Sequence, residues 1–401
     1  MIIVAAILAI FVYGMVAAML GTILPALSLQ YDLTPAQNGY IALAQAVGLT
    51  IASVSVGPLI DNKGKKAGLL LGLALVAATL YVLPSSTGYA MILALLFILG
   101  VGGGIIVTGA NTLVSDVGEK RRASLMNFLN LFFGLGGLAT PFILANILAG
   151  EVEAFRFVHE GLAARGIEPV YALCYLTAIL TTIAVGAHVI APIPPPSGER
   201  GFQLSGAGQL LGRPALYLLA LFLFLYIACE VGVWNWLARH LQAQGVPASE
   251  SLNILSLGFA LGLLVGRVVV APILIKIRPE TVTLAASVLM AVTTYAMLQA
   301  EGTTAAWVAV FCAGVAMAPV FPTTLAMVGN AFPKATATAM GIVITCGWMG
   351  LVVSSPIIGG IAGDDATRLK TALLVLPLAS AAMVVVNVIL RAVLAKPAQA
   401  A

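Results

Sequence analysis

Apolar stretches of about 20 residues recur along the whole chain, and each is long enough to cross a bilayer as a helix. Charged residues make up only 8% of the 401 residues, against roughly 25% in an average soluble domain. Backbone groups that cross lipid must find their hydrogen bonds within helices or closed barrels. The length of the stretches favours helices, so we predict an all-α integral membrane protein.

Twelve membrane-spanning helices are predicted from the apolar runs and the charged, glycine and proline breaks between them. Their bounds are near 3–29, 36–60, 67–86, 89–114, 123–149, 169–191, 213–240, 251–275, 281–299, 303–328, 335–361 and 369–394. The long connection 193–212 is rich in Pro, Gly and Ser, which is typical of a linker. We therefore expect an N-terminal six-helix bundle over 1–192, a cytoplasmic linker over 193–212 and a C-terminal six-helix bundle over 213–401.

A shift of 214 residues aligns landmarks of the two halves. It places Phe97 on Phe311 and Gly100 on Gly314. A constant offset across several helices favours duplicated, pseudo-symmetric bundles. Coincidental glycine and valine matches in so apolar a chain are the alternative.

Most lysines and arginines lie in loops that would face the cytoplasm if both termini do so, and this bias predicts the topology. It also accounts for the net charge of +4 without a nucleic-acid partner. The first apolar run lacks a basic leader and an obvious cleavage site, so we expect a retained helix. Neither the four cysteines nor the three histidines form a ligand or catalytic pattern, so no metal, cofactor or enzymatic activity is expected.

The segment GPLIDNKGKKAG, between the second and third predicted helices, resembles the signature loop of the major facilitator superfamily. Glycine permits close helix approach, aspartate can cap the next helix, and lysines anchor the cytoplasmic edge. In that family the loop latches the cytoplasmic face. The resemblance implies a cytoplasmic gate, to which we also assign the arginine of helix 8; a merely basic topogenic loop is the alternative. The gate residues are Gly57, Asp61, Lys63, Gly64, Lys65, Lys66 and Arg267.

Four segments are similar to the fucose–galactose–glucose proton symporter group of that superfamily: 109–141, 226–241, 262–267 and 318–327. This resemblance implies sugar uptake coupled to protons. The chain departs from it at two positions, because Gly21 and Val107 stand where fucose-type members carry an aspartate and a glutamate. Coupling through those two acids is therefore excluded here, which leaves the substrate and the driving ion open.

Glu230 is the acidic residue that lies well inside a predicted helix. A carboxylate near mid-membrane lines a cavity, finds a partner or titrates, so Glu230 is the candidate for the coupling site. A permanently paired structural carboxylate is the alternative. Arg267 lies deeper in its helix and could bind an anionic substrate or extend toward the cytoplasmic edge.

Amide, hydroxyl and aromatic side chains on the helices expected to line the path favour a small neutral ligand, because no cluster of cations accompanies them. The predicted substrate-binding residues are Tyr13, Gln45, Asn111, Asn127, Asn130, Glu230, Trp234, Asn235, Thr323 and Trp348. We predict a secondary active transporter in the cell membrane, in contact with lipid and monomeric, that moves a sugar or another neutral solute with H⁺ or Na⁺. The alternative is a proton-coupled exporter of drugs or metabolites.

Overall fold

The computed structural model of this protein describes residues 1–56, 60, 63–117, 122–193, 211–332 and 336–394. Helices make up almost all of this described part, which confirms the predicted all-α class. Those of the first half are α1 (Ile2–Gln30), α2 (Pro35–Ser55), α4 (Lys65–Val82) with the short η1 (Leu83–Ser85), α5 (Tyr89–Val117), α6 (Arg122–Ala149), α7 (Glu153–Ala163) and α8 (Pro169–Ile190).

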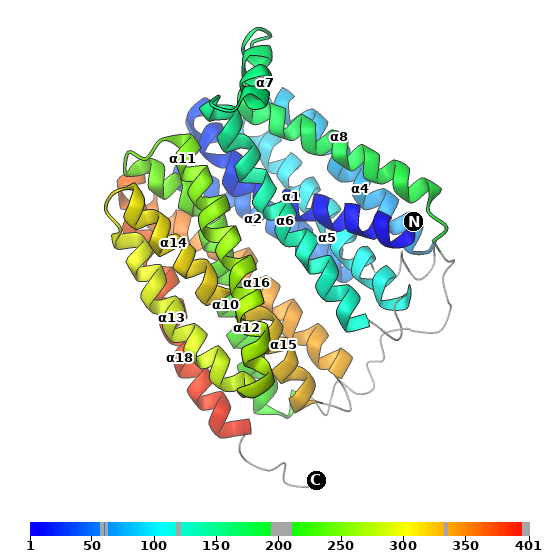
Figure 1. Ribbon diagram of the computed structural model, residues 1–401, viewed down its shortest axis with the longest axis vertical. Coiled ribbons are helices and arrows are strands. Elements are labelled where there is room, and N and C mark those ends of the chain that lie inside the picture. Colours follow the sequence, from blue (N-terminus) through cyan, green and yellow to red (C-terminus); the bar gives the residue numbers. More distant parts are fainter. Residues whose placement is uncertain (57–59, 61–62, 118–121, 194–210, 333–335, 395–401) are drawn as a thin grey trace.

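The second half repeats this arrangement with more interrupted helices (Figure 1). Its eighth predicted span is a continuous rod whose middle turns are π-helical, and its tenth is divided near Pro319. The elements are α10 (Pro214–Ala243), α11 (Ala248–Asn253), η3 (Ile254–Ala260), α12 (Leu261–Lys276), α13 (Pro279–Gln299), α14 (Thr303–Met317), α15 (Val320–Ala331), α16 (Thr336–Ala362), η4 (Ala366–Arg368), α17 (Leu369–Ala372) and α18 (Val375–Leu394).

Among the described residues, 11 helical segments are long and apolar enough to cross a membrane. The helix α2 is the remaining member of the first bundle, where it packs against α5, and it also contacts α16 of the second bundle. Large apolar side chains on the outer faces of the spans are exposed, among them Ile183, Val268 and Val292. Water would not favour such a surface, so these faces meet lipid and the protein is a multi-pass membrane protein.

Close glycine contacts show that the two bundles are pseudo-symmetric. A Cβ atom on Gly48 of α2 would collide with the Phe97 carbonyl oxygen of α5, and one on Gly100 would collide with the Gln45 carbonyl oxygen. The same contacts recur 214 residues later, between Gly262 and the Phe311 carbonyl and between Gly314 and the Phe259 carbonyl. Only glycine lets helix backbones approach so closely. The repeat in the sequence is therefore a repeat of helix packing.

The two bundles contact one another toward one end of the molecule, which we call the α7 side; the opposite end, where α8 ends and α10 begins, is the linker side (Figure 1). On the α7 side α1 packs on α10, α2 on α16, and α6 on α11 and η3. The described hydrogen bonds between the bundles also lie in this region. The helices diverge toward the linker side (Figure 1).

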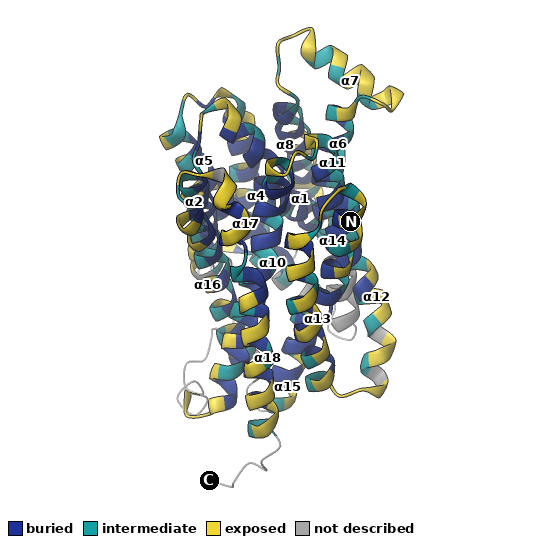
Figure 2. Ribbon diagram, turned by 90° about the vertical axis from the view of Figure 1, so that its left-hand side faces the viewer, coloured by how far each residue is buried: buried dark blue, intermediate teal, exposed yellow. Residues whose placement is uncertain are grey.

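The helix α7 lies outside the twelve predicted spans. It lies in the connection between α6 and α8, beyond the end of the bundle, and none of its residues is buried (Figure 2). At 11 residues it is too short to span a bilayer. A search for long apolar runs therefore passes over it.

Candidate translocation site

An arginine, a glutamate and a tyrosine come together where α10 and α12 pass the middle of the second bundle. Tyr226 and Glu230 are one turn apart on α10 and therefore share a face. The Tyr226 hydroxyl is fully buried and interacts electrostatically with both the Glu230 carboxylate and the Arg267 guanidinium of α12. The structure thus brings Arg267 near Glu230, although no ion pair within 4 Å joins these two described residues.

Two buried atoms of this cluster lack a partner in hydrogen-bonding geometry, although the Tyr226 hydroxyl lies close to the Glu230 carboxylate. Neither the buried Tyr226 hydroxyl nor the buried Arg267 Nε has a described atom in hydrogen-bonding geometry. Glu230 and Arg267 are half-buried, so part of each charged side chain remains accessible. Unpaired polar groups at membrane depth are costly unless they face water or a ligand. This cluster can therefore offer an acceptor, a donor and a positive charge to a bound solute.

Trp234, one turn further along α10, lies at the junction of the bundles. Its ring meets Phe259 of η3 edge-on, with ring centroids 5.3 Å apart and an interplanar angle of 78°. Its carbonyl oxygen occupies the space that a Cβ on Gly21 of α1 would need. Its ring also lies 3.6 Å from the Cβ position of Gly137 in α6. Trp234 therefore contacts both bundles, as a residue that lines a path between them would.

Asn235, a predicted substrate-binding residue, points away from this junction. It is 8% exposed, and its side-chain nitrogen donates to Ser355 Oγ of α16 over 2.9 Å. The neighbouring Trp236 Nε1 donates to the same oxygen over 3.2 Å. The described role of Asn235 is thus to join α10 to α16, and substrate contact stays a prediction for it.

We expect Ser355→Ala to destabilise the protein, because both buried donors would lose their acceptor. The free energy of unfolding should fall by about 1 kcal/mol. Interhelical hydrogen bonds in membranes contribute less to stability than an unpaired donor costs in a dry protein core. Thermal unfolding in detergent measures the change. Thr345→Ala is the matched control, because Thr345 is exposed and donates to a carbonyl of its own helix. An equal effect of both substitutions would contradict the account.

The predicted ligand residues of the first half are dispersed. Tyr13 stacks at an inclined angle on Phe133, with centroids 5.3 Å apart, and Gln45 is 9% exposed with a long contact of 3.5 Å to the Val16 carbonyl. Asn111 donates to the carbonyl of Val107 in its own helix over 2.8 Å. The side chains of Asn127 and Asn130 lie outside the described residues.

Two further candidates lie in the second half. Thr323 of α15 is fully buried, and its hydroxyl has no partner among the described atoms. Trp348 of α16 is half-buried against the core. Their contact with substrate remains a prediction.

The signature loop is only partly described. Gly57 and Asp61 lie outside the described residues, and Lys63 is exposed. Gly64 has φ 87°, a left-handed conformation that favours glycine at the start of α4. Lys66 Nζ donates to the carbonyls of Val189 (2.7 Å) and Ala191 (3.1 Å), which neutralises the C-terminal end of α8.

The polar contacts between the bundles were not found by sequence reasoning. Arg239 of α10 donates to Ser28 Oγ over 3.3 Å and to the Leu33 carbonyl over 3.2 Å. The Ala36 amide donates to the Gly363 carbonyl over 3.1 Å, and Ser256 Oγ donates to the Leu138 carbonyl over 2.7 Å. Backbone carbonyls accept most of these bonds, so no residue type in the sequence signals them.

A hollow of about 530 Å³ lies elsewhere, on the α7 side between connections 244–247 and 300–303. It is bordered by one bundle only, and so it is separate from the junction at Trp234.

Two pseudo-symmetric helical bundles that span a membrane and meet at Trp234 form the architecture of a membrane transporter. The chain belongs to the Major Facilitator Superfamily, whose family model matches residues 6–355 and 236–400. This confirms the family resemblance of the signature loop.

Several relatives within the family are named for different substrates. The chain is 23% identical over 362 residues to bypass of stop codon protein 6 of Saccharomyces cerevisiae, covering 84% of this chain and 72% of that protein. It is 24% identical to the gentisate transporter of Corynebacterium glutamicum, covering 84% of this chain and 76% of that protein. It is also 24% identical to a glucose/galactose transporter of Brucella abortus, with coverage of 58% and 56%.

Solved structures share the fold at low identity. The nucleoside transporter NupG superposes with a TM-score of 0.77 at 13% identity, covering 99% of this chain and all of that one. A variant of the Escherichia coli fucose:proton symporter FucP superposes with a TM-score of 0.66 at 19% identity, with coverage of 97% and 98%. These likenesses support the predicted architecture and leave the substrate open.

Proposed function

We propose that this protein is a secondary active transporter that moves a small polar solute, a sugar in the first instance, together with a proton. The observation that carries the proposal is the group formed by Tyr226, Glu230 and Arg267, in which the Tyr226 hydroxyl and Arg267 Nε are buried without a partner in hydrogen-bonding geometry. Sugar hydroxyls can donate to the carboxylate and accept from the guanidinium. Trp234 offers an apolar face beside them.

The close contact at Gly21 supports Glu230 as the coupling residue. Fucose-type members carry an aspartate at the matching position of helix 1, but here the Trp234 carbonyl fills that space. A side chain at residue 21 would force α1 away from α10. The carboxylate of this protein lies one turn from Trp234 on α10 itself, so the acidic group faces the same junction from the opposite bundle.

Proteoliposome counterflow tests the proposed substrate class. Labelled L-fucose, D-glucose, gentisate and uridine are each exchanged against the same unlabelled solute, with protein-free vesicles as the control. We expect saturable exchange of a sugar and pH-driven accumulation of the same sugar. Exchange of none of the sugars, together with pH-driven efflux of a dye, would instead support the exporter.

An organic anion is a second candidate substrate, favoured by Arg267 specifically. Its guanidinium has no ion-pair partner among the described residues, and a carboxylate would supply one. The gentisate transporter among the relatives is named for such a solute. In the same counterflow series, gentisate exchange without sugar exchange would favour this candidate.

We also propose that the described conformation is the one open to the cytoplasm. Under the expected orientation the linker side is cytoplasmic, and the contacts between the bundles gather on the opposite side. Release to the outside then requires those contacts to break while the linker side closes. Lys66 of the signature loop, which is held at the end of α8, lies where that second closure is expected.

Arg239→Ala is expected to weaken the closure of the α7 side, because it removes two bonds from a guanidinium to the other bundle. Since each charge-assisted bond contributes about 1.5 kcal/mol, the population open on the α7 side should rise by about tenfold or more. Distances between spin labels at Leu29→Cys and Lys370→Cys, both exposed and on opposite bundles, report the opening. Arg165→Ala is the control, since Arg165 bonds only within its own segment. An unchanged distance distribution would contradict the latch.

A further inference from the structure

Residues of three kinds lie on three different faces of α7. With successive side chains about 100° apart, Glu153, Arg156 and Glu160 fall on one third, and Phe155, His159 and Leu162 fall on a second. The remaining third carries Ala154, Phe157, Val158 and Gly161. Each sector therefore has its own chemistry, and each needs a different surrounding.

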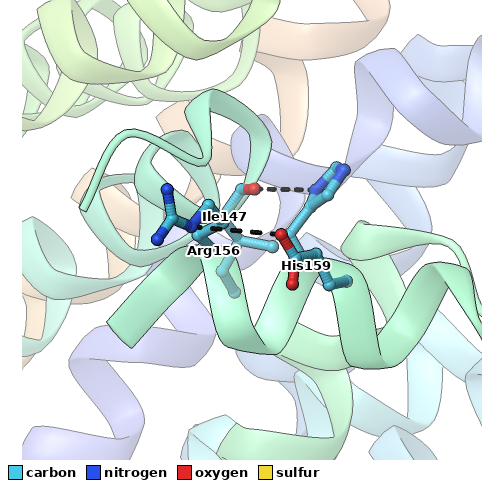
Figure 3. A network of polar contacts seen from close by, with 4 residues as sticks. Ile147, Arg156 and His159 are labelled. Atoms are coloured by element: carbon cyan, nitrogen blue, oxygen red, sulfur yellow. Dashed lines mark hydrogen bonds and ion pairs between the residues drawn. The ribbon is translucent and has the colours of Figure 1, made fainter. Parts of the chain in front are cut away.

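The polar sector faces water. Arg156 Nε and Glu160 Oε1 form an ion pair of 3.9 Å, and their side chains are 58% and 70% exposed (Figure 3). Such a pair holds the two long side chains along one side of the helix.

The second sector faces the protein. The side chains of Phe155, His159 and Leu162 are half-buried, whereas those of the polar sector are exposed. His159 Nδ1 lies 3.0 Å from the carbonyl oxygen of Ile147 near the end of α6, which fixes the rotation of α7 about its axis (Figure 3). The other two sectors are thereby turned away from the bundle.

The third sector is covered by protein only at Gly161, where the Arg165 side chain donates to the Gly161 carbonyl. Phe157 is 78% exposed and Val158 is 40% exposed, although both are apolar. Residues 150–152 and 164–168 connect α7 to two membrane spans. At no more than about 3.6 Å per residue, these connections keep α7 within roughly 20 Å of both span ends, and hence at the membrane surface.

We propose that the third sector of α7, with Phe157 and Val158 as its large apolar side chains, inserts into the phospholipid interface on the α7 side. A helix at the membrane interface beside a bundle meets water on one side, protein on a second and acyl chains on a third. The polar, half-buried and apolar sectors of α7 match these three surroundings. Insertion places the apolar sector about 5–10 Å into the boundary between headgroups and acyl chains. The two glutamates outnumber the one arginine, so apolar burial drives insertion rather than attraction to anionic lipid.

Spin-label accessibility in proteoliposomes tests this insertion. Single cysteines replace Phe157 and, as the matched control, its neighbour Arg156, in a chain whose four native cysteines are changed to alanine. Oxygen concentrates in acyl chains and a nickel chelate stays in water. We expect the label at 157 to collide more often with oxygen, and the label at 156 more often with nickel, in pure phosphatidylcholine and equally after phosphatidylglycerol is added.

Three results would overturn the proposal. Nickel accessibility at both positions would place α7 wholly in water. Shielding of residue 157 from both reagents, with spin–spin broadening between copies, would show that a second copy covers the sector. Oxygen accessibility that appears only with phosphatidylglycerol would make the contact electrostatic. Val158→Cys repeats the measurement should the variant at Phe157 fail to assemble, as judged by gel filtration.

Discussion

Glu230→Gln should abolish accumulation against a gradient while leaving exchange of solute across the membrane. Glutamine keeps the size and a hydrogen-bonding oxygen of glutamate, but it cannot release a proton or carry a negative charge. If Glu230 carries the proton, a pH gradient imposed on proteoliposomes no longer concentrates the solute, and the labelled sugar only equilibrates. Counterflow of the same sugar should remain close to that of the native protein, because counterflow needs binding and reorientation but no net proton movement.

The control is Glu301→Gln, which removes a carboxylate from the same bundle at an exposed position near the start of α14. Both variants are tested with proton and sodium gradients separately. Native accumulation by the Glu230 variant would remove this residue from coupling. The native protein could instead accumulate solute with a sodium gradient and not with a proton gradient. If the Glu230 variant then loses this sodium-driven accumulation, the same carboxylate is assigned to Na⁺ coupling.

Gly21→Ala should reduce net transport by about tenfold or more. The added methyl group would overlap the Trp234 carbonyl oxygen, lie 2.8 Å from its carbonyl carbon and lie 3.1 Å from the Asn235 Cα. All three are backbone atoms, which cannot rotate away as a flexible side chain could. Overpacking of this kind costs about 1–3 kcal/mol, and about 2 kcal/mol corresponds to roughly thirtyfold in the population of the state closed on the α7 side. Counterflow rates and the spin-label distances between residues 29 and 370 measure the two consequences.

Gly186→Ala is the matched control, because that glycine lies inside α8 and a Cβ there would meet nothing within 4 Å. Alanine is the better helix former by about 1 kcal/mol, so this variant should transport normally and melt no lower than the native protein. Native transport by Gly21→Ala would mean that α1 and α10 do not approach so closely during the working cycle.

The positions of the spans could be predicted because long apolar runs carry their own boundary signals. Predicted bounds of 123–149 and 169–191 compare with Arg122–Ala149 and Pro169–Ile190 in the structure. The prediction was less complete where a helix is interrupted, as at Pro319, or amphipathic and short, as in α7. The average hydrophobicity of a segment shows neither where a helix is interrupted nor whether a short amphipathic segment is helical.

The candidate site was predicted only in part. Glu230 and Arg267 stand out because charges within a span are rare, but their common proximity to the Tyr226 hydroxyl follows from how α10 packs near α12. Asn235 is predicted as a ligand residue from its position next to Trp234; its side chain donates to Ser355, and its contact with substrate stays a prediction. Adjacent helix residues point about 100° apart, so proximity in sequence does not place them on one face.

The sequence by itself determined the membrane class, the helical spans and the duplication, because the energy of moving each segment from water into lipid depends on that segment's own composition. Tertiary structure decided that the Tyr226 hydroxyl and Arg267 Nε are buried without partners, why residue 21 must lack a side chain, and how Arg239 and Ser256 join the bundles. These features depend on contacts between helices far apart in the chain. Many of those contacts are made to backbone carbonyls, which every residue possesses and which no residue letter reveals.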